Sequence, residues 1–212
     1  MRRIACLHTV DSNVAVFDAA LASLGRRDLE LHHRVRADLL SRAEREGGLT
    51  AEIATETVGV LQEMSAAADA VLLTCSTLGP AAETAADEAS CPILRVDAAL
   101  AAEAVAGGGT VVVLCAVETT IGPTRRLFER AASHTGATVS IELVPDAWDA
   151  FKAGDTDRYH QLIAAAADRA LQGGAARVAL AQASMAGASR LAVGGAEVLN
   201  SPVVGLAAAA IA

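Results

Sequence analysis

The chain has 212 residues, of which 53% are hydrophobic and only 2% aromatic, and its formal net charge is −8. This hydrophobic content excludes a disordered chain, and the length suits one large domain or two small lobes. The negative charge argues against nucleic acid and anionic membrane surfaces as partners, and the scarcity of aromatic residues argues against a large stacking pocket.

Strand-like and helix-like segments alternate along the chain. Apolar patterns predict strands over 3–9, 29–35, 70–74, 92–96, 110–115, 138–144, 176–181 and 202–206. Helical spacing predicts helices over 14–24, 49–67, 80–89, 98–106, 123–132, 155–171 and 185–193. Continuous apolar strands that alternate with helices are typical of a parallel sheet covered on both faces, so we expect an α/β fold.

The two halves of the chain resemble each other. A shift of 107 residues, the distance from Cys75 to Gln182, places 4–7 on 111–114, 71–73 on 178–180 and 75–78 on 182–185. With three more residues, 91–94 falls on 201–204. This repeat predicts two pseudo-symmetric lobes, 1–106 and 107–202, with 203–212 returning to the first lobe. Ligands of open α/β sheets bind at the carboxyl ends of the strands, so we expect the active site in a cleft between the lobes.

Cys75 stands at the end of an apolar strand, before Ser76, Thr77, Gly79 and Pro80. Pro80 predicts the start of a helix. The free N–H groups of a helix start lower the pKa of a nearby thiol, so we expect Cys75 to be a reactive acid/base group. The alternative is a buried structural thiol.

The other cysteines, Cys6, Cys91 and Cys115, show neither a C-x-x-C pair nor a Cys/His ligand spacing. We therefore expect no metal site and no disulfide, and we interpret Cys6 and Cys91 as packing residues. No signal peptide is expected, and the apolar run over 203–212 is about half of a membrane span. These observations predict a cytoplasmic protein.

Four segments together resemble the aspartate/glutamate/hydantoin racemase superfamily. They are Leu-Thr-Cys-Ser-Thr at 73–77, the strand and threonine-rich loop over 111–120, Leu-Ala-Gln-Ala-Ser-Met at 180–185, and Asn-Ser-Pro-Val at 200–203. The resemblance covers nearly the whole chain. It implies a racemase-like isomerase of amino-acid metabolism that needs no cofactor, pyridoxal phosphate included, and acts on a small carboxylate such as an amino acid or a hydantoin. It also implies two cysteines that act as base and acid at the α-carbon.

The sequence departs from this pattern at Gln182, where the second cysteine is expected. An amide neither takes nor gives a proton near neutral pH, whereas inversion of a stereocentre needs proton transfer on both faces. Three alternatives therefore stay open: a single-cysteine decarboxylase, a cis–trans isomerase of a diacid, and a non-catalytic small-molecule binding protein on the same scaffold.

Several polar residues follow the predicted strands and complete the expected site. We expect the substrate to be bound by Ser12, Asn13, Ser76, Thr77, Thr119, Thr120 and Ser184, although helix capping also explains the hydroxyls. His8 is a candidate acid or base, Asp38 a candidate border residue, and Cys115 a poor substitute for the missing thiol. His32 and His33 are adjacent on a strand and must face opposite sides. The alanine content favours a homodimer.

Overall fold

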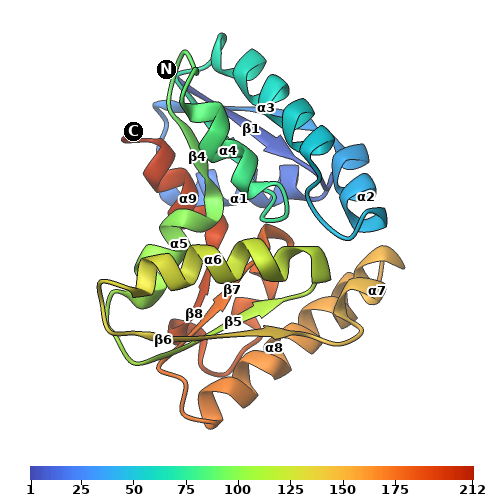
Figure 1. Cartoon of the computed structure of the whole chain (residues 1–212). Coiled ribbons are helices and arrows are strands. Elements are labelled where there is room, and N and C mark those ends of the chain that lie inside the picture. The colour runs from blue at the N-terminus through green and yellow to red at the C-terminus, as the bar shows by residue number, and fades with distance from the viewer. The chain divides into compact units, whose positions relative to one another are not determined.

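Each half of the chain folds around a four-stranded parallel sheet. The computed structural model describes residues 1–212, apart from the side chain of Ala196. Unit 1 comprises Met1–Ala99 and Pro202–Ala212, and unit 2 comprises Leu100–Ser201. The N- and C-terminal residues of the chain therefore both lie in unit 1 (Figure 1). The predicted α/β class is confirmed.

The sheet of unit 1 has the strand order β2-β1-β3-β4. Its strands are β1 (Arg2–His8), β2 (Leu29–Val35), β3 (Ala70–Leu73) and β4 (Ile93–Arg95). Its helices are α1 (Asn13–Leu24), α2 (Ala37–Arg45), α3 (Ala51–Ser65), α4 (Gly79–Ala86) and α9 (Ser201–Ala209), while α5 (Val96–Val105) runs through the boundary of the two units.

Helices α1 and α3 cover opposite faces of this sheet. Phe17 of α1 packs on the ring of His8, with 5.2 Å between the ring centroids. Ala5 points to the other face because side chains alternate along a strand, and there it lies near Met64 of α3. Thr50 caps α3, since its hydroxyl accepts a hydrogen bond of 3.4 Å from the Ile53 N–H.

The sheet of unit 2 has the order β6-β5-β7-β8. Its strands are β5 (Thr110–Cys115), β6 (Thr138–Leu143), β7 (Arg177–Leu180) and β8 (Val198–Asn200). Its helices are α6 (Ile121–Ala132), α7 (Ala147–Lys152) and α8 (Thr156–Gln172), with short 3-10 turns η1 (Glu118–Thr120), η2 (Ala183–Arg190) and η3 (Gly195–Glu197). Apolar residues of α8 pack on one face of β5 and β7, and those of α5 and α6 pack on the other.

The predicted repeat is visible in the strand pairing. In unit 1, Ile4 of β1 pairs with Ala70 of β3. In unit 2, Val111 of β5 pairs with Arg177 of β7, which is the same register after a shift of 107 residues. The residues that follow these central strands therefore occupy equivalent positions in the two units.

Two expectations for the C-terminal part are wrong. The segment predicted as a strand over 202–206 lies in α9, because Pro202 suits a helix start and the alanines that follow favour a helix. The last strand is β8, and Val198 pairs with Val178 as Ile93 pairs with Val71. Ile93 is thus equivalent to Val198, and the three-residue extension of the repeat alignment is incorrect.

Helix α9 belongs to unit 1 through close contacts. Gly205 lies against Val96, where an added Cβ would be 2.4 Å from Val96 Cγ2. The carbonyl of Ala209 also accepts a hydrogen bond of 3.5 Å from the Arg2 guanidinium. Among all the helices of the described residues, none is long and apolar enough to cross a bilayer.

Candidate active site

Cys75 lies two residues beyond the end of β3, at the carboxyl edge of the unit 1 sheet. Leu7 of β1 pairs with Leu73 of β3. Continuing this register by two residues brings Thr9 beside Cys75. The thiol is hydrogen-bonded to the Thr9 side chain and to the backbone at Thr77 and Leu78. The residue is 8% exposed. The predicted position at the strand end is therefore observed, and Thr9 joins it as a residue that sequence reasoning missed.

The expected lowering of the Cys75 pKa is wrong for the structure as it stands. Burial disfavours the thiolate and raises the pKa above the ordinary value of 9.0. The hydrogen bonds from Thr9 and from the backbone act in the opposite direction but do not outweigh burial, and the charge of Asp97 raises the pKa further. Cys75 is thus a protonated thiol at neutral pH. The hydrogen-bond donors around it stabilise the thiolate when the proton is removed.

Other predicted residues of unit 1 lie at the same edge. Ser76, Thr77 and Asn13 are buried, whereas Ser12 is exposed. Among the described residues, Asn13 Oδ1 is a buried oxygen without a hydrogen-bond partner. A buried polar atom in this state is unusual and suits a ligand that supplies a donor. We refer to Thr9, Asn13, Cys75, Ser76 and Thr77 as the Cys75 group.

A buried ion pair between Arg95 and Asp97 was not predicted. The Arg95 guanidinium donates to both carboxylate oxygens of Asp97 at 3.0 Å, and to Glu83 at 2.8 Å. Gly79, the first residue of α4, lies against this guanidinium, since an added Cβ would be 2.5 Å from Arg95 Nη2. The pair therefore supports the start of α4, the helix that directly follows Cys75, Ser76 and Thr77.

Gln182 occupies in unit 2 the position that Cys75 occupies in unit 1, two residues beyond the central strand. Its Oε1 accepts a hydrogen bond of 2.6 Å from the Ala116 N–H, and its Nε2 donates to Thr120 Oγ1 at 3.0 Å. The Thr120 hydroxyl in turn donates to the Val117 carbonyl. These bonds fix the side-chain amide between the ends of two adjacent strands.

Ser184 and Thr119 also follow the strands of unit 2. Ser184 Oγ lies 2.9 Å from the hydroxyl of the buried Tyr159, and the Ser184 carbonyl lies 3.0 Å from His160 Nε2. Thr119 is partly buried in η1. We refer to Thr119, Thr120, Gln182 and Ser184 as the Gln182 group.

Three further candidates have partners of their own, and Cys115 is hydrogen-bonded to Thr120 and Gln182. Cys115 is fully buried in the core between β5 and α6, and burial raises its pKa. His8 hydrogen-bonds to Thr74 and His33. Asp38 forms an ion pair with Arg36 (2.6 Å), which lowers the pKa of its carboxyl.

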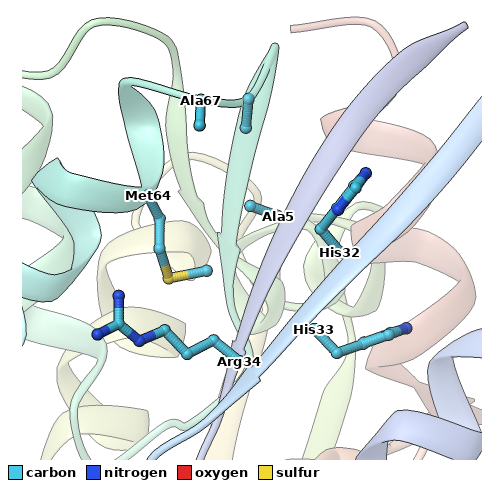
Figure 2. A pocket seen from close by; sticks show the side chains of 7 residues that line it. Ala5, His32, His33, Arg34, Met64 and Ala67 are labelled. Carbon is cyan, nitrogen blue, oxygen red and sulfur yellow. The ribbon is translucent and has the colours of Figure 1, made fainter.

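A hollow of about 180 Å³ lies on the α3 side of the unit 1 sheet. Figure 2 shows Met64 and Arg34 on one side of the strands and His33 extending to the other side. This agrees with the prediction that His32 and His33 face opposite ways: His32 lies 3.5 Å from Glu30, and His33 lies 3.2 Å from Asp18. The residues that line the hollow include no member of the Cys75 group.

Comparisons with known proteins agree with the two-unit fold. The family described as Asp/Glu/Hydantoin racemase matches residues 7–212. Among solved structures, Picrophilus torridus aspartate racemase has a TM-score of 0.74 at 13% identity, covering 99% of this chain and 95% of the other. Allantoin racemase from Klebsiella pneumoniae has a TM-score of 0.66 at 17% identity, covering 100% and 87%. Glutamate racemase from Thermus thermophilus has a TM-score of 0.66 at 16% identity, covering 99% and 79%. A comparison with curated protein sequences gives no significant match.

Proposed function

Because the chain belongs to the Asp/Glu/hydantoin racemase family, we propose that it is a cofactor-independent enzyme that moves a proton at the α-carbon of a small carboxylate, with Cys75 as the acid/base group. The observation that carries this proposal is the environment of Cys75. A thiol at the end of a strand is surrounded by the Thr9 side chain and the backbone of Thr77 and Leu78. Such donors stabilise a thiolate when it forms and an anionic substrate group beside it.

Substrate binding is assigned to the polar members of both groups. In unit 1, Ser76, Thr77 and Asn13 offer hydroxyls and an amide, and the Asn13 oxygen lacks a partner among the described residues. In unit 2, the Gln182 side chain is hydrogen-bonded to the Ala116 N–H, the Thr120 hydroxyl and the Cys115 thiol. We assign Gln182 to positioning these side chains and not to proton transfer, because an amide neither gives nor takes a proton near neutral pH.

A second candidate activity is favoured by one specific observation. Burial keeps Cys75 protonated at neutral pH, and Gln182 offers no second acid or base. A single protonated thiol suits a reaction in which a carbanion is formed by loss of CO₂ and then receives one proton. The candidate is therefore a single-cysteine decarboxylase of a substituted malonate. The incubation experiment that separates these activities also identifies a diacid cis–trans isomerase or a binding protein.

One experiment separates these possibilities. The protein is incubated in D₂O with amino acids, hydantoins and substituted malonates, and the α-carbon is followed by NMR and chiral chromatography. Deuterium entry with inversion supports a racemase, entry with retention supports exchange by one base, and release of CO₂ supports the decarboxylase. An interconversion of unsaturated diacids would support the isomerase.

The control for this experiment is a matched pair of variants. Cys75→Ala should abolish the reaction, whereas Cys91→Ala, which changes a half-buried cysteine outside the group, should leave it unchanged. Circular dichroism checks that both variants fold. Absence of reaction with every substrate, together with ligand binding that Cys75→Ala does not change, would overturn the enzyme proposal in favour of a binding protein.

A further inference from the structure

Three side chains of metal-ligand type meet on the α1 face of the unit 1 sheet. Cys6 and His8 are two residues apart on β1 and so share a face. Cys6 pairs with His33 of β2 in the parallel register, which brings His33 to the same place. The Cys6 sulfur and ring nitrogens of the two histidines all lie within 4.8 Å of one another. Cys6 and His8 are buried, and the His33 side chain is 15% exposed.

The hydrogen bonds around the two rings define which nitrogens carry protons. The Thr74 hydroxyl donates to the Leu7 carbonyl at 3.1 Å, so it accepts from His8 Nδ1 at 2.8 Å. This assignment, inferred from the network, leaves a lone pair on His8 Nε2, 2.8 Å from His33 Nδ1.

The outer nitrogen of His33 is also held. His33 Nε2 lies 3.2 Å from Asp18 Oδ1, so it donates to this carboxylate. His8 Nδ1 thus faces the Thr74 hydroxyl and His33 Nε2 faces the Asp18 carboxylate. The other two nitrogens, His8 Nε2 and His33 Nδ1, point at each other near Cys6. Metal-binding histidines show this arrangement, because an outer oxygen acceptor fixes the ring and raises its basicity.

We propose that Cys6 Sγ, His8 Nε2 and His33 Nδ1 bind one Zn²⁺ ion in unit 1, with a fourth position open to water. Thiolate and imidazole together are a preferred ligand set of Zn²⁺. Tetrahedral zinc with bonds of about 2.0–2.1 Å places two nitrogens roughly 3.3 Å apart, so the rings must separate by about half an ångström. His33 reaches the surface and can make this movement.

The charges of the site balance when the ion is bound. The Cys6 thiolate and the nearby Asp18 carboxylate together offset the two positive charges of Zn²⁺. Binding requires the Cys6 thiol to lose its proton to become a thiolate ligand. In the absence of a cation, burial raises the pKa of Cys6 to about 12 and keeps the thiol protonated. The site is independent of the substrate chemistry proposed above.

Cobalt is a suitable probe because tetrahedral Co²⁺ bound to a thiolate absorbs in both the near-ultraviolet and the visible. The full chain, stripped with EDTA, is titrated with Co²⁺ and then with Zn²⁺. We expect one Co²⁺ per chain, a thiolate charge-transfer band, and displacement by Zn²⁺. Zn²⁺ should also raise the melting temperature. Absence of the charge-transfer band would overturn the proposal.

Matched variants locate the ion. Cys6→Ser should remove the charge-transfer band, and His33→Asn should weaken Co²⁺ binding more than 100-fold. His32→Asn, which changes the neighbouring histidine on the opposite face, should change it less than twofold. Equal losses for His33→Asn and His32→Asn would contradict the assignment.

The variant Asp18→Asn tests the site even if the substitution of a buried ligand prevents folding. Asp18 contributes an exposed side chain, 61% accessible, so Asp18→Asn should fold normally. Loss of such an outer partner typically costs 10–100-fold in metal affinity, and we expect a loss within that range. An unchanged affinity in a folded Asp18→Asn protein would count against the site.

Discussion

Gln182 Oε1 accepts a hydrogen bond of 2.6 Å from the backbone N–H of Ala116, across the ends of β7 and β5. The side chain in the position equivalent to Cys75 therefore has a structural role, whatever it does to a substrate. It satisfies a buried N–H that the parallel pairing leaves unpaired once the strands end.

Gln182→Ala should accordingly destabilise the protein. It leaves the Ala116 N–H without its acceptor, and an unsatisfied buried donor costs about 1–3 kcal/mol of unfolding free energy. Urea denaturation measures the change. Gln172→Ala, at an exposed position near the end of α8, serves as the control and should have little effect. Equal stability of the two variants would mean that water replaces the lost acceptor.

Gln182→Cys tests the proposed one-thiol chemistry. If the proposed one-thiol chemistry is right, a second thiol at this position adds a second acid/base group, so we expect a gain in deuterium entry with inversion relative to the parent. The double variant Cys75→Ala/Gln182→Cys should lose that gain. A folded Gln182→Cys variant that shows no inversion above the parent would contradict this prediction.

The raised pKa of Cys75 predicts slow alkylation at neutral pH. Only the thiolate reacts with iodoacetamide, and a pKa above 9.0 leaves less thiolate at pH 7 than in an ordinary cysteine. The rate of Cys75 modification, followed by peptide mass spectrometry, should still be rising with pH at pH 9. A plateau below pH 8 would show that the hydrogen bonds to the sulfur outweigh burial.

Gly79→Ala should disturb the buried pair of Arg95 and Asp97. The added Cβ would lie 2.5 Å from Arg95 Nη2, and a buried guanidinium that must move weakens its hydrogen bonds to Asp97. We expect a loss of about 1–3 kcal/mol in unfolding free energy. Gly59→Ala in α3 is the matched control: it meets nothing within 4 Å and should stabilise the helix by roughly 0.5–1 kcal/mol. Two variants with the same sign would contradict this account.

Much of the fold could be predicted from the sequence because parallel strands buried on both faces form continuous apolar runs. The repeat, the parallel sheet of each unit and the positions of Cys75 and Gln182 beyond the central strands all follow from those runs, whereas β8 does not. Helix α9 was mistaken for a strand because a short apolar segment fits either structure. Ser201 followed by Pro202 is the sequence signal that favours a helix start here.

Contacts between distant segments could not be predicted in the same way. The Thr9–Cys75 bond requires the register of β1 and β3, and the grouping of Cys6 with His33 requires the register of β1 and β2. Ligand spacings in the sequence reveal only residues that are close along the chain, whereas Cys6 and His33 belong to different strands. The pKa of Cys75 was misjudged for a related reason: burial depends on the whole unit, whereas the helix start is a local feature.

The placement of α9 bears on the order in which the chain becomes foldable during synthesis. Unit 2 is one continuous stretch, Leu100–Ser201, whereas unit 1 needs Pro202–Ala212 to cover Val96. While the ribosome synthesises unit 2, the apolar surface of unit 1 that α9 later covers remains exposed. The first unit to begin is therefore the last to be completed, because its final helix emerges only after the whole of unit 2.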